Sequence, residues 1–178
     1  MEYKLAICSA LLAFSTVHAA ADPKPLGFGS PLTPEALKPF DIDVRGDGAG
    51  LPPGRGTVKE GEAVFAQSCA ACHGAGGEHP ISQSILLTGG QGTLPTPHPV
   101  KTVGSYWPYA TTLYDYIYRA MPFNAPQSLS PSQVYAVTAY VLHLNGILRA
   151  DATLDAASLP KVQMPNKDGF ITSYAAGK

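Results

Sequence analysis

Residues 69–73 read Cys69-Ala70-Ala71-Cys72-His73, so two thiols lie three residues apart and an imidazole follows the second directly. In a helical turn both sulfur atoms lie on one side, where each can form a thioether with one vinyl group of a porphyrin. His73 then lies beneath the ring and can offer its imidazole to the iron. C-x-x-C-H is the attachment signature of c-type haem. The spacing therefore predicts one covalent haem c, held by Cys69, Cys72 and His73.

Two other chemistries use the same pair of cysteines. A redox-active C-x-x-C normally lies in a βαβ context, and no strand pattern surrounds Cys69 and Cys72. A structural zinc site needs more ligands than this pair, and no second cysteine pair follows it. The third cysteine, Cys8, falls in the leader described below, which leaves the motif without a disulfide partner elsewhere. These observations favour haem over either alternative.

The 178 residues suffice for one domain with extensions, and the net charge of −1 provides no basic field for nucleic acid. Lys4, an apolar run from Leu5 to Phe14 and small residues up to Ala21 are typical of a cleaved secretory signal, which predicts a periplasmic protein. No later apolar segment is long enough to span a membrane. We expect these segments: signal peptide 1–20, a Pro/Gly-rich surface arm 21–56, a haem-binding domain 57–146, and an extended tail 147–178.

Three helices are predicted, over 58–68, 112–120 and 131–145. Capping boxes begin the first and the third, because Thr57 is followed by Glu60 and Ser130 by Gln133 at the required spacing. Pro122 ends the second helix, and Asn145-Gly146 is a typical end for the third. Apolar residues recur at helical spacing and predict the buried faces. Those of the second helix are Leu113, Tyr116, Ile117 and Ala120; those of the third are Val134, Val137, Tyr140, Val141 and Leu144.

The iron needs a sixth ligand or keeps an open position. Met121 follows the second helix directly, and its thioether would complete His/Met coordination, which suits electron transfer. Met121 would otherwise fill space in the core. Met164 in the tail is a rival methionine, and bis-histidine ligation would use one of three other histidines. These are His79, His98 and His143.

Four of these positions resemble the pattern of class I cytochromes c: Gly61, Phe65, Cys69 and Tyr140. In that family a glycine on the N-terminal helix lets the C-terminal helix cross closely, and the two aromatic residues pack at the crossing. The resemblance implies a mostly α-helical class I cytochrome c fold around one haem, with loop-rich extensions at both ends. It also implies that a proline carbonyl fixes the ligating histidine, and Pro80 is the candidate for that role.

A longer stretch, from Val100 through Trp107 and Met121 to Ser130, resembles the cytochrome subunit of bacterial sulfane and sulfite dehydrogenases of the Sox sulfur-oxidation type, as does Met164 to Phe170. The resemblance implies that Trp107 lies at the haem edge and bonds a propionate; a plain core tryptophan is the alternative. Sulfane dehydrogenase cytochromes often carry two haems, whereas this chain has a single C-x-x-C-H.

The resemblance implies a role in electron transfer rather than catalysis by the chain alone. We expect it to accept single electrons from a molybdenum dehydrogenase subunit and to pass them to a downstream cytochrome c or oxidase. Two alternatives stay open: a free periplasmic carrier that serves several partners, and a haem enzyme with an open sixth site.

Overall fold

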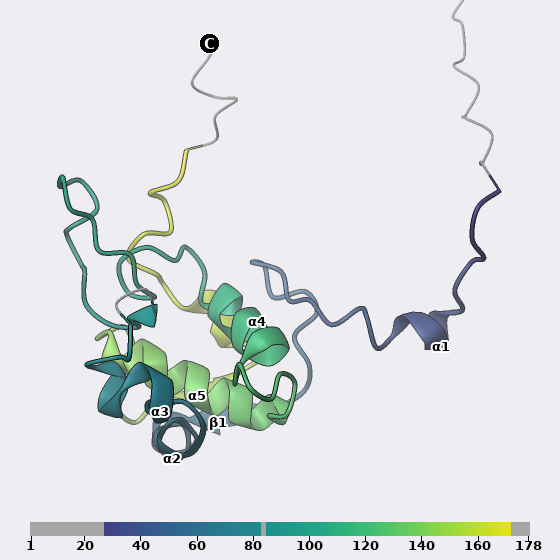
Figure 1. Ribbon diagram of the computed structural model, residues 1–178, viewed down its shortest axis with the longest axis horizontal. Helices are drawn as coiled ribbons and strands as arrows, with labels where there is room; N and C mark the ends of the chain where they lie inside the picture. Colours follow the sequence, from purple (N-terminus) through teal and green to yellow (C-terminus); the bar gives the residue numbers. More distant parts are fainter. Residues whose placement is uncertain (1–26, 83–84, 172–178) are drawn as a thin grey trace, which may run out of the picture.

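The computed structural model describes residues 27–82 and 85–171, so the expected signal peptide over 1–20 lies outside the described residues. Four helices and two short strands form the body of the molecule, and a further helical turn lies in the N-terminal arm (Figure 1). The elements are α1 (Pro34–Leu37), β1 (Arg55–Thr57), α2 (Val58–Ser68), α3 (Ala70–His73), the 3₁₀ turn η1 (Ala75–Gly77), α4 (Ala110–Ala120), α5 (Pro131–Leu144), β2 (Thr153–Asp155) and the 3₁₀ turn η3 (Leu159–Lys161).

Both predicted capping boxes are confirmed. Glu60 Oε2 accepts from the Thr57 backbone N–H at 2.8 Å, while Thr57 Oγ1 accepts from the Glu60 N–H at 3.1 Å. The bond from the Thr57 N–H, helped by one from the Thr57 hydroxyl, holds the pKa of Glu60 below its usual range, because both stabilise the carboxylate form. Ser130 and Gln133 repeat the arrangement at the start of α5. The caps set the first residues of α2 and α5 where the sequence predicts them, so local chemistry defines both starts.

The crossing of α2 and α5 forms the centre of the fold (Figure 1). Gly61 lies at the closest approach, where a Cβ atom would overlap the backbone carbonyl of Ala136. Beside it, the rings of Phe65 and Tyr140 pack with centroids 5.3 Å apart at an interplanar angle of 56°. The predicted roles of Gly61, Phe65 and Tyr140 are therefore confirmed. Because α2 leads directly into residues 69–73, this crossing also fixes the position of the cysteines.

Helix α4 buries Leu113 and Ile117 as predicted, but Tyr116 does not share their face. Tyr116, predicted to be buried, is 48% exposed, whereas Tyr114 is fully buried. The Tyr114 ring lies 4.5 Å from that of Tyr135 and 5.8 Å from that of Tyr118. The prediction for Tyr116 is wrong because a run of alternating aromatic residues fits two neighbouring helical faces, and contact with α5 selects between them.

The segments before and after the helices share the same core. Strands β1 and β2 pair antiparallel, with Gly56 opposite Leu154. Val44, Leu154, Leu159 and Met164 are all buried and belong to the cluster that includes Phe65. The part of the tail that the structure describes therefore packs against the helical body. Within that described part of the chain, no helix is long and apolar enough to cross a membrane.

Candidate haem site

The two cysteines and His73 lie on one helical turn at the end of α2. Cys69 caps α2 by donating its N–H to the Phe65 carbonyl at 2.8 Å. The N–H groups of Cys72 and His73 then both donate to the Cys69 carbonyl, at 3.1 and 3.0 Å. Gly74, at φ 78°, ends the turn. Both thiols are free, with Cys69 half-buried and Cys72 exposed, so the helical turn that haem attachment needs is present.

The imidazole of His73 is oriented by a backbone carbonyl. Nδ1 lies 2.9 Å from the carbonyl oxygen of Ile85. A carbonyl only accepts hydrogen bonds, so Nδ1 carries the proton and Nε2 keeps the lone pair that a metal ligand requires. The half-buried ring is thus held in one tautomer and one orientation. This is the arrangement expected of a haem ligand.

The acceptor is Ile85 and not Pro80, which corrects the sequence expectation. After Gly74 the chain turns sharply, and the Ile81 N–H donates to the Cys72 carbonyl at 3.0 Å. This bond holds residue 81 against the backbone of the haem-binding motif, so Ile85, further along the chain, supplies the carbonyl that reaches the ring. No periodic pattern in the sequence marks Ile85, and sequence reasoning therefore missed it.

The electrostatics of Cys69 argue against a redox-active dithiol. Burial raises the pKa of the Cys69 thiol to about 11, and the neighbouring Cys72 adds to this increase. Catalytic dithiols instead depend on a thiol whose pKa is lowered, because the thiolate is the nucleophile. Within residues 27–82 and 85–171, no three His, Cys, Asp or Glu side chains are grouped to hold a metal ion. The donor set fits covalent haem, with two thiols for the vinyl groups and one oriented imidazole for the iron.

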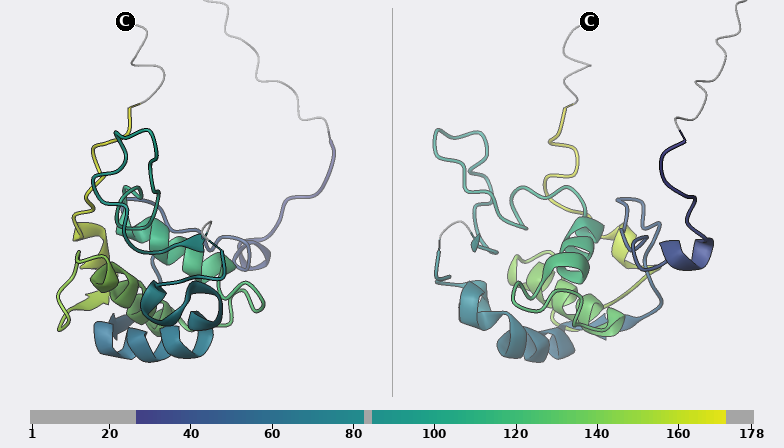
Figure 2. Two further views of the ribbon diagram at one scale, coloured as in Figure 1. Left: turned by 60° about the vertical axis from the view of Figure 1, so that its left-hand side comes forward. Right: turned by 45° about the vertical axis from the view of Figure 1, so that its right-hand side comes forward.

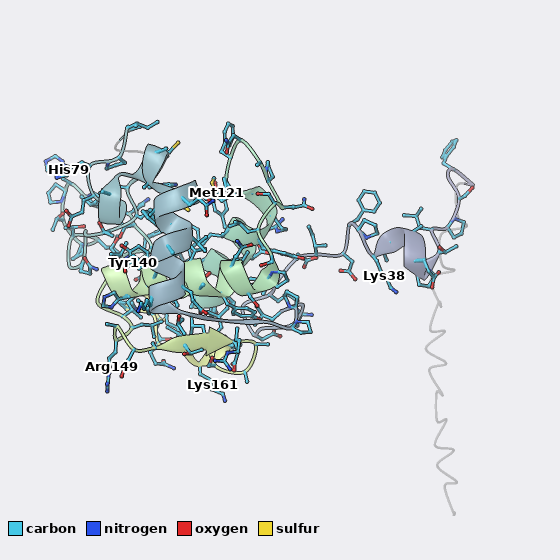
Figure 3. All side chains as sticks on the ribbon, turned by 90° about the horizontal axis from the view of Figure 1, so that it is seen from below. Lys38, His79, Met121, Tyr140, Arg149 and Lys161 are labelled. Atoms are coloured by element: carbon cyan, nitrogen blue, oxygen red, sulfur yellow. The ribbon has the colours of Figure 1, made fainter. Side chains whose placement is uncertain are left out.

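Met121 lies at the exit of α4. Its N–H donates to the Ile117 carbonyl at 3.0 Å, and its extended backbone leads into Pro122. The side chain is half-buried and packs on the edge of the core. In the projection of Figure 3 the labelled Met121 falls beside α2. Its thioether is thus only half-buried, at the point where α4 ends.

The other side chains considered as sixth ligand lie in different settings. Met164 is only 4% exposed and sits inside the core cluster. His143 is held at the end of α5, where its Nδ1 lies 2.9 Å from the Leu148 carbonyl. His79 and His98 are exposed on loops. Met121 is thus the methionine that lies at the surface of the core and not within it.

Trp107 is half-buried at the edge of the core. Its ring meets that of Tyr116 edge-on, with centroids 5.8 Å apart and an interplanar angle of 88°. Tyr116, which is 48% exposed, thus keeps one ring contact. The loop before Trp107 is held by buried hydroxyl groups: Thr102 Oγ1 donates to the Gly89 carbonyl at 2.6 Å and Ser105 Oγ to the Val100 carbonyl at 2.7 Å. The sequence did not single out Thr102 and Ser105.

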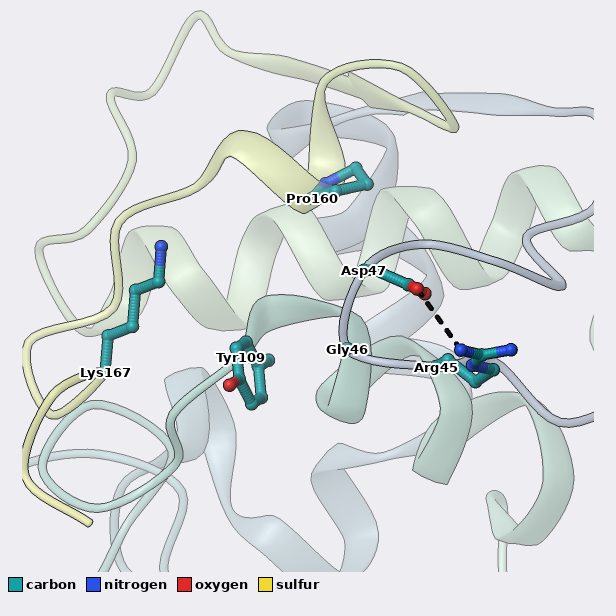
Figure 4. Close-up of a pocket in the computed structure, with 6 residues that line it drawn as sticks. All are labelled: Arg45, Gly46, Asp47, Tyr109, Pro160 and Lys167. Atoms are coloured by element: carbon teal, nitrogen blue, oxygen red, sulfur yellow. Dashed lines mark hydrogen bonds and ion pairs between the residues drawn. The ribbon is translucent and has the colours of Figure 1, made fainter. Parts of the chain in front are cut away.

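An open cleft lies apart from residues 69–73, between the N-terminal segment, the start of α4 and the tail (Figure 4). Arg45 and Asp47 face each other across 3.5 Å on one side, and Tyr109, Pro160 and Lys167 line the rest. The two charged side chains are 70% and 62% exposed, so their ion pair adds little to stability. The cleft has no group that resembles a haem ligand.

Comparison with known proteins agrees with a haem-binding site. Residues 56–141 match the family described as cytochrome C oxidase, cbb3-type, subunit III. The structure also matches a chain in the crystal structure of the sulfane dehydrogenase SoxCD from Paracoccus pantotrophus, with a TM-score of 0.79 and 43% sequence identity. That match covers 85% of this chain and 74% of the other. Curated proteins include no significant match to the chain.

Fold, site and similarity together define a c-type cytochrome, whose domain transfers electrons through haem c. Within that class, the chain belongs to the class I cytochrome family that includes the cytochrome subunit of the sulfane dehydrogenase SoxCD.

Proposed function

We propose that this chain is a periplasmic monohaem cytochrome that accepts single electrons from a molybdenum sulfane or sulfite dehydrogenase. It passes them to a downstream cytochrome c or oxidase, and it is not an enzyme on its own. The observation that carries this proposal is the 43% identity to a chain of SoxCD over 85% of the present chain, joined to an intact C-x-x-C-H turn. The apolar, small-residue leader in the sequence supports export to the periplasm.

Each residue of the turn has a separate task. Cys69 and Cys72 anchor the haem through thioethers, and His73 binds the iron through Nε2. The Ile85 carbonyl accepts a hydrogen bond from the Nδ1–H of His73. This bond leaves Nε2 unprotonated and fixes the orientation of the ring. When bound, haem supplies a one-electron couple between ferric and ferrous iron.

Met121 is proposed as the sixth ligand. Its half-buried position at the exit of α4 supports this role, and a thioether ligand raises the reduction potential and leaves no open position for substrate. Trp107, which is half-buried and braced by Tyr116, is proposed to donate its indole N–H to a haem propionate. His/Met coordination favours electron relay over catalysis at the iron.

A free carrier with several partners is a second candidate. It is favoured by the single C-x-x-C-H of this chain, where the resemblance suggests a two-haem subunit. A subunit and a free carrier differ in the strength of their association with the dehydrogenase. A haem enzyme with an open sixth site is the third alternative, and it requires that Met121 does not bind iron.

The test is haem reduction by a purified molybdenum sulfane or sulfite dehydrogenase. Thiosulfate or sulfite is added to the two proteins, and the ferrous haem band is followed by stopped-flow absorbance. Oxidation of a sulfur substrate by two electrons should reduce two copies of the cytochrome. The substrate without dehydrogenase is the control. Haem that stays oxidised with enzyme and either substrate present would contradict the proposal. Co-purification with the dehydrogenase distinguishes a subunit from a free carrier.

A further inference from the structure

The N-terminal arm, residues 27–43, exposes an unusual amount of apolar surface. Phe28 is 91% exposed, Leu32 63%, Leu37 46% and Phe40 76%. Single exposed apolar residues are normal on protein surfaces, but four large ones within 13 residues mark an interaction site. Elsewhere in the described residues, the large apolar side chains exposed to a similar degree are spread over separate segments, among them Ile81, Phe123 and Ile171.

In the part of the chain that the structure describes, no hydrogen bond joins residues 27–41 to the helical body. The three views in Figures 1 and 2 all show the arm extending away from the helical body. The hydrogen bonds described for residues 27–41 stay within that segment, such as Thr33 Oγ1 accepting from the Ala36 N–H at 3.2 Å. Its only helix, α1, has four residues, which is far below the length at which a helix is stable alone. Contact with another molecule would supply the missing stabilisation.

The root of the arm is, in contrast, firmly anchored on α4. The buried carboxylate of Asp115 accepts from the Val44 N–H at 2.7 Å and is paired with Arg119. Thr111 Oγ1 donates to the Gly46 carbonyl at 3.2 Å. Asp115 precedes Met121 by six residues, which is about 9 Å along the helix axis. The arm is thus tethered to the helix that carries the proposed haem ligand at its exit.

The similarity to the SoxCD chain reaches into the arm. It covers 85% of this chain, or about 151 of 178 residues, whereas residues 44–178 make up only about 76%. At least part of the first 43 residues must therefore lie within the matched region. The arm thus belongs to the portion of the chain that is shared with a component of a dehydrogenase complex.

We propose that residues 27–43 form a docking arm, whose apolar side chains Phe28, Leu32, Leu37 and Phe40 bind an apolar groove on the catalytic subunit of the electron-donating dehydrogenase. This rests on the proposed function, and it adds where and how the two proteins associate. The charges of the arm disfavour an anionic lipid surface, because Glu35, Asp41 and Asp43 outnumber Lys38.

The test is a double variant, Phe28→Ser with Phe40→Ser, in the full haem-loaded protein. Its dissociation constant for the molybdenum dehydrogenase is measured by calorimetry, with Ile171→Ser as the matched control because Ile171 is 86% exposed and lies outside the arm. Loss of two apolar anchors should raise the dissociation constant by about 100-fold, and the control should leave it within about twofold. An unchanged constant for the double variant would overturn the proposal.

Two further readouts separate the possible causes. At saturating dehydrogenase the double variant should be reduced as fast as the wild type, since its haem site is intact. If the wild type itself is not reduced, the proposed function fails. If the wild type is reduced but the double variant binds with unchanged affinity, only the docking arm fails. If the wild type dimerises by itself and the double variant is monomeric, the arm binds a second copy and the proposal is overturned. If the wild type binds neutral lipid vesicles and the double variant does not, the arm binds lipid and the proposal is likewise overturned.

Discussion

Replacing Gly61 with alanine tests the helix crossing on which the haem-binding turn depends. The added Cβ would overlap the carbonyl of Ala136 and lie 2.8 Å from the Cβ of Tyr140, so α2 and α5 would have to move apart. Neither neighbour is the flexible end of a side chain. The crossing therefore cannot relax by a simple rotamer change.

The expected effect is the difference between two opposing terms. Alanine is a better helix former than glycine by about 1 kcal/mol. Overpacking of a core typically costs about 1–3 kcal/mol, and displacement of backbone belongs at the upper end of that range. The net loss of unfolding free energy is therefore about 2 kcal/mol, which lowers Tm by about 4–8 °C for a chain of this size.

Thermal unfolding of the haem-loaded protein, followed by circular dichroism, measures this change. The control is Ala63→Gly on the exposed side of the same helix, which should cost about 1 kcal/mol through helix propensity alone. If Gly61→Ala raised Tm, the propensity term would dominate, and the reasoning about close backbone contact would be refuted.

Three other variants probe the ligand, the core and the arm root. Met121→Ala should abolish the far-red absorption band of a methionine-ligated ferric haem and lower the reduction potential, whereas a band that persists would refute Met121 as ligand. Burial raises the pKa of Tyr135 to about 12; its folded pKa exceeds the unfolded value of about 10, so its contribution to stability is present below pH 10 and is lost as the pH rises toward 12. Tyr135→Phe should reduce that alkaline loss in urea titrations, at a cost of about 1 kcal/mol at pH 7 from the bond to the Pro52 carbonyl; an unchanged alkaline profile would contradict this. Asp115→Ala should cost about 2–3 kcal/mol and accelerate hydrogen exchange at the Val44 amide, and a protected amide would show that the arm root is held otherwise.

The features that the sequence predicts correctly are those set by neighbours in the chain. The capping boxes at Thr57 and Ser130 involve groups three residues apart, and the helical turn of residues 69–73 closes through bonds of equally short range. The predicted helices 58–68, 112–120 and 131–145 agree with α2, α4 and α5 within two residues at each end. The crossing at Gly61 was predictable because a glycine inside a helix needs a packing reason.

The features that the sequence missed depend on the path of the chain through space. Ile85 reaches His73 across 12 residues, and Asp115 reaches Val44 across 71. No local period records either pairing, and a choice such as Tyr114 over Tyr116 is made by the helix that packs against them.

The sequence alone thus determined that the chain binds haem c and where the helices begin, because thioether attachment and helix capping need fixed residue types at fixed short spacings. The tertiary structure alone decided which carbonyl orients His73, that Tyr114 and not Tyr116 is buried on α4, and where the arm is anchored. These contacts join residues far apart in the chain, and only the packed core brings such residues within bonding distance.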